Sequence, residues 1–453
     1  MSYHYQSILC IILIVICVTF ISKFIQSKEF NKALLTVIVL TFILKSFCAL
    51  DSFLHEWDER YHALVAKHLI QHPLTPTLYE NPVEPYDHKN WVANHIWLSK
   101  PPLPLWFMSA SIATFGTHEF AVRLPAIIFS LLSVLLTYRM GVILFSQKAG
   151  VIAALLHSIH GVLTDLASGR LSSDGVETTF LFFVSLGIFW VLRKPIGQFK
   201  LLDYIITGMI TGLAFMSKWQ PSLLVLIVLF IYHFDKKHFW KHSLYCTLSL
   251  FATMIVVLPW ALYCFAKFPT EAEWMAEAIF HPMTIIIPGN DGTWYSYLTD
   301  FGNFFGYPTY VLGIISIYLA IKDYNRKLLT LAIWIAVPLM IFSAAEIKRG
   351  TYLMISAPAI FLLVAYFATA VVVYWKKYPI SKWLAYVSII SMVVYSIERL
   401  YLFSNRKPRH LEWSDELKNR NPVPSSVIYD EPHAIELMFY HDVTAYPFSK
   451  KEN

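Results

Sequence analysis

The sequence predicts an all-α protein that crosses a membrane many times, and three observations support this fold class. The chain has 453 residues, of which 57% are hydrophobic and 15% charged, and its mean hydropathy is +0.52. Soluble domains carry about 25% charged residues. Apolar runs of roughly 16 to 24 residues recur along the chain and match the thickness of a bilayer core. Many tyrosines and tryptophans lie at the ends of these runs, where their rings suit the membrane interface.

The apolar runs predict about twelve membrane-spanning helices. They cover residues 7–22, 33–50, 121–144, 150–166, 174–192, 201–217, 219–234, 243–265, 302–320, 328–344, 352–374 and 383–402. The first run is short for a spanning helix, so a signal peptide is the alternative for it. A second apolar run follows closely and no small-residue cleavage site is visible, which favours a retained helix.

Lysines and arginines in the short loops predict the orientation of the chain. They recur in every second loop, as a cytoplasmic set does. These loop cations are Lys23, Lys28, Lys32, Lys148, Arg193, Lys194, Lys200, Lys236, Lys237, Lys241, Lys322, Arg326, Lys327, Lys376, Lys377 and Lys382. The other side of the membrane receives residues 51–120, residues 266–300 and the tail after Phe403. We therefore expect these three segments to be extracytoplasmic.

The two long extracytoplasmic loops are expected to contain structure of their own. Residues 61–70 and 103–115 read as amphipathic helices that are too short to span the membrane and suit its interface. The loop over 266–300 begins as an acidic helix and continues into a turn at residues 288–292.

The polar tail is expected to form a small extracytoplasmic α/β appendage, with a strand, a short helix and a second strand. This predicts a transmembrane catalytic domain at residues 1–402 and a small domain at residues 403–453. The five cysteines lie within or at the edge of apolar runs and read as packing residues.

Ionisable residues gather on the extracytoplasmic face, near the ends of spans. Such residues are costly at a membrane and usually functional. The acidic ones are Asp58, Glu59 and Asp174. The others are Lys100, Lys218, His281, Lys348 and Arg349, with Tyr352 close behind. Cations on this side run against the usual charge bias, so we expect an anionic partner, because lysine and arginine both bind phosphate.

A sugar carried on a polyprenyl phosphate has the properties of that partner. Its phosphate lies at the membrane surface, while its apolar chain stays in lipid. A transferase for it needs cations to stabilise the charge that develops as the glycosyl bond breaks. It also needs a carboxylate to orient or deprotonate the acceptor, and an apolar groove that opens to the bilayer. The clustered lysines and aspartates supply the first two requirements.

Seven motifs, in their order along the chain, resemble those of GT-C glycosyltransferases that use polyprenyl-phosphate sugars. They are Asp58-Glu-Arg-Tyr61, Lys100-Pro-Pro-Leu103, Glu119-Phe-Ala-Val-Arg123-Leu-Pro125, Ser172-Ser-Asp174, Gly212-Leu-Ala-Phe-Met-Ser-Lys218, Leu258-Pro-Trp260 and Lys348-Arg-Gly-Thr-Tyr352. Each is weak alone, but their order and shared sidedness are specific. The families that the chain resembles are the lipid A aminoarabinose transferases and the dolichyl-phosphate-mannose protein mannosyltransferases.

The resemblance implies an inverting transferase of the bacterial cytoplasmic (inner) membrane, with its active site facing the periplasm or exterior. Asp58 matches the catalytic aspartate of the family. The residues expected to bind the donor phosphate are Lys100, Lys218, Lys348, Arg349 and Tyr352. Those expected to contact the acceptor or line the cavity are Glu59, Asp174 and His281. The donor is a polyprenyl-phosphate sugar, with undecaprenyl phosphate as the expected carrier.

Structural roles are the alternative for several of these residues. Asp58 and Asp174 each stand where a helix begins, and aspartate is a common helix cap. Lys100 has an apolar stem that lets its ammonium reach the interface from a helix lying there. Arg123 reads as a residue that fixes the entry of its span or pairs with Glu119.

Departures from the resembled families leave the acceptor open. The tail is much shorter than the periplasmic domain of the aminoarabinose transferases, and the second long loop lacks their arginine-containing pattern. Ser99 stands before Lys100 where some relatives have an acidic residue. We expect a lipid, glycan or protein acceptor, and membrane lipids as the surroundings. No metal site or other cofactor is evident, a divalent metal stays open, and nothing indicates nucleic-acid binding.

Two other function classes fit part of the pattern. A secondary transporter would also have about twelve spans, but its charges would lie near the bilayer midplane between repeated halves. A ligase or polymerase of lipid-linked glycans would share the architecture. Transfer of one sugar rather than an assembled chain would distinguish the transferase from the latter.

Overall fold

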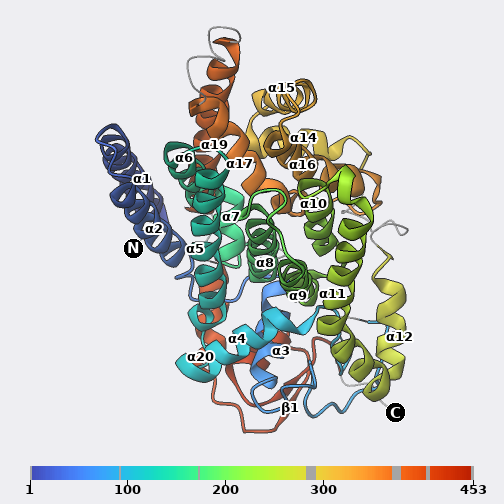
Figure 1. The fold of residues 1–453 in the computed structure, drawn as a ribbon. Helices are drawn as coiled ribbons and strands as arrows, with labels where there is room; N and C mark the ends of the chain where they lie inside the picture. The colour runs from blue at the N-terminus through green and yellow to red at the C-terminus, as the bar shows by residue number, and fades with distance from the viewer. Residues whose placement is uncertain are drawn as a thin grey trace.

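The computed structural model describes residues 3–90, 93–171, 174–281, 292–369, 379–404 and 409–449. Within them, long helices form a bundle and dominate the molecule (Figure 1). Nine described helices are long and apolar enough to cross a membrane, and eleven spans result if each of two bent pairs counts as one. The predicted class, an all-α polytopic membrane protein, is confirmed.

All twelve predicted spans contain helix. The straight spans are α1 (Tyr3–Gln26), α2 (Phe30–Cys48), α5 (Glu119–Leu144), α8 (Asp174–Leu192), α9 (Leu201–Lys218), α11 (Phe239–Lys267), α16 (Arg326–Ala344), η3 (Gly350–Ser356) with α17 (Ala357–Thr369), and α19 (Pro379–Ser404). The run at 219–234 is shorter than a spanning helix and consists of η1 (Gln220–Leu223) and α10 (Leu224–Tyr232). The end of the run at 352–374 lies outside the described residues.

The two remaining runs are bent. Helices α6 (Gln147–Ile159) and α7 (Gly161–Ala167) meet at 58°, and α14 (Ser296–Phe305) and α15 (Pro308–Lys322) meet at 101°. Gly306 separates α14 from α15 with a φ of +83°, a conformation that glycine adopts without steric cost. The apolar run at 302–320 is therefore divided at Gly306.

Helices α9 and α11 pack closely because α9 presents glycines to α11. A Cβ atom at Gly208 would lie 2.1 Å from the carbonyl oxygen of Ser249, and one at Gly212 would lie 2.6 Å from the Cβ of Val256. Small residues four positions apart allow two helix backbones to approach in this way. The packing fixes α9, whose last residue is Lys218.

Shorter elements gather at one end of the bundle, the lower end in Figure 1. They include α3 (Asp58–His68), α4 (Pro102–Phe115), α12 (Pro269–Ala278), α20 (Arg409–Asn419) and β1 (Val427–Ile428). Helices α3 and α4 confirm the two short helices expected in the first long loop. Of the turn expected at 288–292, only Gly292 is described.

The tail folds against α3 rather than standing apart. Strand β1 pairs in parallel with β2 (Thr444–Ala445), as the strand–helix–strand pattern predicted, and α21 (Ala434–Tyr440) connects them. Side chains of α21 and α3 share one hydrophobic cluster. Helix α20 was not predicted. A domain boundary at residue 402 stays a prediction.

Candidate active site

Helix α3 begins at Asp58 and places this carboxylate beside Lys100. Trp57 has a φ of +73°, which turns the chain sharply just before the helix. Asp58 is 7% exposed, and its Oδ2 lies 3.2 Å from the Nζ of Lys100. Burial raises the pKa of Asp58, but the surrounding cations, Lys100 first, outweigh burial and hold it below its usual value. Asp58 is therefore ionised at neutral pH, as a base must be.

Lys100 is placed at the entrance of α4 by the two prolines that follow it. Pro102 is the first residue of α4, a position that suits proline because no helical partner is lost there. Burial lowers the pKa of the Lys100 ammonium, and Asp58 raises it to a net value above the usual one. Lys100 therefore carries its charge in the site.

A cavity of about 490 Å³ lies next to this ion pair. Its charged lining residues are Lys100, Glu177, Lys218 and Arg349. Most of the remaining wall is apolar and comes from α10, α16, η3 and the end of α12 with the two residues after it. A largely apolar cavity with a few convergent charges, in this range of volume, is typical of a ligand site.

Lys218 reaches the cavity from the last position of α9. Its ammonium forms an ion pair with Glu177 and lies 4.2 Å from the ring centroid of Tyr352. Tyr352 also lines the cavity. Trp219, with a φ of +38°, ends the helix directly after the lysine. The tight link between the two apolar runs thus serves to present Lys218.

Arg349 and Lys348 are neighbours in sequence but point to different surroundings. Arg349 lines the cavity, and its Nε is buried without a hydrogen-bond partner among the described residues. The Nζ of Lys348 instead donates to backbone carbonyls at the end of α16, at 2.8 Å for Ser343. Lys348 is not among the residues that line the cavity, and its phosphate-binding role stays a prediction.

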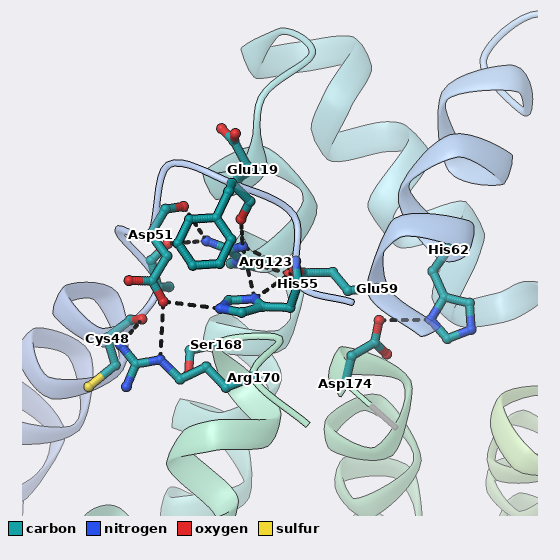
Figure 2. Close-up of polar contacts among 12 residues, drawn as sticks. Cys48, Asp51, His55, Glu59, His62, Glu119, Arg123, Ser168, Arg170 and Asp174 are labelled. Carbon is teal, nitrogen blue, oxygen red and sulfur yellow. Dashed lines mark hydrogen bonds and ion pairs between the residues drawn. The ribbon is translucent and has the colours of Figure 1, made fainter. Parts of the chain in front are cut away.

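Asp174 begins α8 and is paired with a histidine of α3 (Figure 2). Its Oδ2 lies 2.7 Å from the Nδ1 of His62, and its Oδ1 accepts the backbone N–H of Val176 at 3.0 Å. Asp174 is 1% exposed and has a φ of +38°. Ser172 and Ser173, the rest of its motif, lie outside the described residues. Asp174 is thus held near the start of α3, although the lining of the cavity does not include it.

Three residues with positive φ stand at this site, namely Trp57, Asp174 and Trp219. A positive φ is strained for residues other than glycine and persists where the surrounding structure enforces it. Each of the three either holds or directly adjoins a charged residue of the site. This strain is a feature of functional sites.

Glu59, the neighbour of Asp58, belongs to a separate group of buried charges that we call the anchor cluster (Figure 2). Its members are Asp51, His55, Glu59, Arg123 and Arg170. Arg123 binds both oxygens of Glu59, through Nε at 2.7 Å and Nη2 at 3.0 Å, and also donates to the carbonyls of residues 49, 51 and 53. His55 donates its backbone N–H to Glu59 Oε2 at 2.6 Å.

The anchor cluster leaves no room between Glu59 and the loop before α8. Gly169 has a φ of +75°, and a Cβ atom there would lie 1.9 Å from Glu59 Oε1. Glu59 is not among the residues that line the cavity, so its role as an acceptor or cavity residue stays a prediction. Glu119, the partner expected for Arg123, instead binds Lys418 and Tyr440 of the tail.

His281 follows Phe280, which lines the cavity, but His281 is not itself part of the lining. Its contact with a substrate stays a prediction. No group of three or more residues able to hold a metal ion occurs among the described residues.

Two residues at the site were missed by the sequence reasoning. Glu177, the partner of Lys218, lies one helical turn after Asp174, and a carboxylate within a predicted span is costly enough to have drawn notice. His62 lies one turn after Asp58 and pairs with Asp174. Helical spacing from the two aspartates is the signal that would have found both.

Comparison with known sequences points to one group of enzymes. Residues 99–263 match the dolichyl-phosphate-mannose-protein mannosyltransferase family. The chain is 25% identical over 287 residues to an undecaprenyl phosphate-alpha-4-amino-4-deoxy-L-arabinose arabinosyl transferase of Pseudomonas aeruginosa, a match that covers 58% of this chain and 49% of that protein. A relative from Proteus mirabilis is 24% identical over 280 residues, with the same coverage. The chain spans about half the length of the curated relatives it matches.

Comparison with solved structures shows the fold. ArnT from Cupriavidus metallidurans superposes with a TM-score of 0.66 at 14% identity, covering 93% of this chain and 86% of that one, and the same protein bound to undecaprenyl phosphate gives 0.66 at 13%. An oligosaccharyltransferase from Archaeoglobus fulgidus gives 0.57 at 13% identity, with 91% and 64% covered. The GT-C fold expected from the sequence is confirmed, as is a multi-pass membrane protein.

Proposed function

We propose that this chain is a glycosyltransferase of the bacterial cytoplasmic membrane that takes a sugar from a polyprenyl-phosphate donor. The observation that carries the proposal is the ion pair of Asp58 and Lys100, which stands at an apolar cavity with further cations in its wall. Relatives named for an undecaprenyl-phosphate sugar, and a structure of similar fold bound to undecaprenyl phosphate, support this donor.

The cavity suits both parts of such a donor. Lys100, Lys218 and Arg349 converge from the segment before α4, the end of α9 and the segment before η3, and each is positioned to meet a phosphate oxygen. The apolar wall suits the first isoprene units. Arg349 has a buried Nε without a hydrogen-bond partner among the described residues, as expected of a group that binds an anionic ligand.

The proposed reaction is a direct displacement at the anomeric carbon. The acceptor hydroxyl or amine gives its proton to Asp58 and attacks from the side opposite the phosphate. The bond between the anomeric carbon and the phosphate oxygen breaks, and its electron pair leaves with the lipid phosphate. Lys100 and Lys218 stabilise that charge. One displacement of this kind inverts the anomeric configuration.

The experiment that tests the proposal uses the purified protein in lipid vesicles. It is offered radiolabelled undecaprenyl-phosphate sugars with a crude membrane fraction as the source of lipid, glycan and protein acceptors. Label that leaves the carrier with the intact protein but not with Asp58→Ala supports the proposal, and the labelled product identifies the acceptor. No release from any donor, together with saturable uptake of a small solute, would contradict it and favour a transporter.

A further inference from the structure

A buried histidine lies between the two aspartates of the site. His62 is on the same face of α3 as Asp58, one turn later, and it is fully buried. The Trp97 ring packs against its imidazole in a T-shaped arrangement, with ring centroids 5.6 Å apart. His62 is therefore kept from bulk water by its neighbours.

The two nitrogens of His62 differ in their surroundings. Nδ1 lies 2.7 Å from Asp174 Oδ2 (Figure 2). Nε2 is buried and has no hydrogen-bond partner among the described residues. A buried polar atom without a partner costs free energy, so its presence calls for an explanation.

Asp58 lies close enough to His62 for the two charges to interact, and its Oδ2 forms an ion pair with Lys100. The Nε2 of His62, which has no hydrogen bond among the described residues, thus occurs one turn from this carboxylate on the same helix. An imidazole with a carboxylate on its other nitrogen accepts a proton readily, because the carboxylate stabilises the imidazolium.

We propose that His62, held by Asp174, receives the proton that Asp58 removes from the acceptor. This inference rests on the proposed transferase function. The new bond joins the acceptor to the anomeric carbon, the bond to the phosphate breaks, and its electron pair leaves with the phosphate. The acceptor proton passes from Asp58 to Nε2 of His62, directly or through one water, and later to solvent. His62 is then a positioning residue that acts through Asp58.

The charges around the pair favour this transfer. Asp174 comes from α8 and Asp58 from α3 itself, while the cations near Asp58 are Lys100 and Arg349. Protonated His62 therefore stands between two carboxylates. After transfer, Asp58 is ionised again and ready for the next acceptor.

The test replaces His62 by glutamine. The glutamine amide still donates a hydrogen bond to Asp174, but it does not bind a proton. We expect His62→Gln protein to keep its thermal stability and its KM for the donor, to lose about 100-fold in kcat, and to lose the acidic limb of the kcat–pH profile. Retention of a wild-type kcat and profile would overturn the proposal, because hydrogen bonding alone would then suffice.

The matched control is His68, a second buried histidine of α3. Its Nδ1 lies 2.9 Å from the carbonyl oxygen of Thr77, and it does not contact the cavity. His68→Gln protein should keep the wild-type profile. If His62→Gln protein does not fold, Asp174→Asn replaces it: a retained acidic limb with unchanged kcat would overturn the proposal equally.

The outcome separates this inference from the proposed function. Wild-type protein that transfers no sugar contradicts the transferase itself. Active wild-type protein, an inactive Asp58→Ala variant and a fully active His62→Gln variant contradict only the role of His62.

Discussion

The anchor cluster and the cavity use the same kinds of side chain in opposite ways. In the anchor cluster, both oxygens of Glu59 are taken up by Arg123 and His55, and Asp51 is bound by His55 and Arg170. At the candidate site, Asp58 pairs with Lys100, while His62 and Arg349 each keep a buried polar atom without a hydrogen bond in the described part of the chain. Satisfied charges hold a structure together, whereas unsatisfied ones are available to a substrate.

Asp58 and Glu59 make this contrast at adjacent positions. Successive residues of a helix point about 100° apart, so one carboxylate meets Lys100, which lines the cavity, and the other meets Arg123 of α5. The first is expected to act in catalysis and the second to fix the loop that carries it. Four predictions test whether this division is correct, and the largest expected effect comes first.

Removal of the negative charge of Asp58 should abolish turnover without harming the fold. We expect Asp58→Asn to lower kcat roughly 1,000-fold, within the range of a lost general base, and to leave the unfolding temperature in detergent near that of the wild type. Transfer assays and thermal unfolding on the same preparation check both. A large fall in the unfolding temperature of the variant would instead show that Asp58 has a structural role, like the residues of the anchor cluster.

Removal of the charge in the anchor cluster should do the reverse. Arg123→Gln leaves Glu59 buried without its cation, which costs about 3 to 5 kcal/mol of stability. Thermal unfolding of the purified variant measures this loss. Lys241→Gln, in the first turn of α11, is the control. An Arg123→Gln protein as stable as the wild type would show that the cluster does not anchor the loop.

Acid should destabilise the protein through the anchor cluster. Burial raises the pKa of Glu59, but Arg123 and His55 outweigh it and lower the pKa to about 2, from an ordinary 4.5. Arg170 and His55 likewise hold the pKa of Asp51 at about 2. The stability gained from these ionised groups is complete above pH 4.5 and is lost as the pH falls toward 2.

Unfolding temperatures measured between pH 6 and pH 3 check this dependence. Glu59→Gln protein should start lower and change less with pH than the wild type. An equal slope for both proteins would assign the acid sensitivity to other carboxylates.

The smallest effects should come from Lys100 and Lys348, and they should differ in kind between the two lysines. Lys100→Met is expected to raise the KM for the donor about tenfold, as the loss of one charged hydrogen bond does. Lys348→Met should leave that KM within about twofold and lower stability by about 1 kcal/mol, because its ammonium binds helix-end carbonyls. An equal rise in KM for both variants would show that Lys348 also binds the donor phosphate.

Much of the architecture was predictable because the bilayer constrains the chain locally. Helix length and apolar composition are properties of contiguous segments, and they predicted most of the spans, α3, α4, and the two strands and α21 of the tail. The orientation that loop charge indicates stays a prediction. The bend between α14 and α15 was not predicted, because the apolar composition of a run does not show where its helix bends. Helix α20 was missed because only three of its eleven residues are apolar.

The site was predictable only in outline. Asp58 and Lys100 were identified by their position at an extracytoplasmic face and by short motifs, and the structure brings them together. The assignments of Glu59 and Lys348 rested on the same argument and stay predictions, because their side chains contact Arg123 and the end of α16 and are not part of the cavity lining. Glu177 and His62 were overlooked, although both lie one turn from a chosen aspartate.

The sequence by itself determined the membrane class and supplied the set of charges from which the site is built. Tertiary structure alone decided which of those charged groups pair with one another. Arg123 of α5 pairs with Glu59, His62 of α3 pairs with Asp174 at the start of α8, and Lys218 at the end of α9 pairs with Glu177 of α8. A carboxylate is structural or reactive according to the partners that distant segments bring to it, and those partners are set by packing rather than by local pattern.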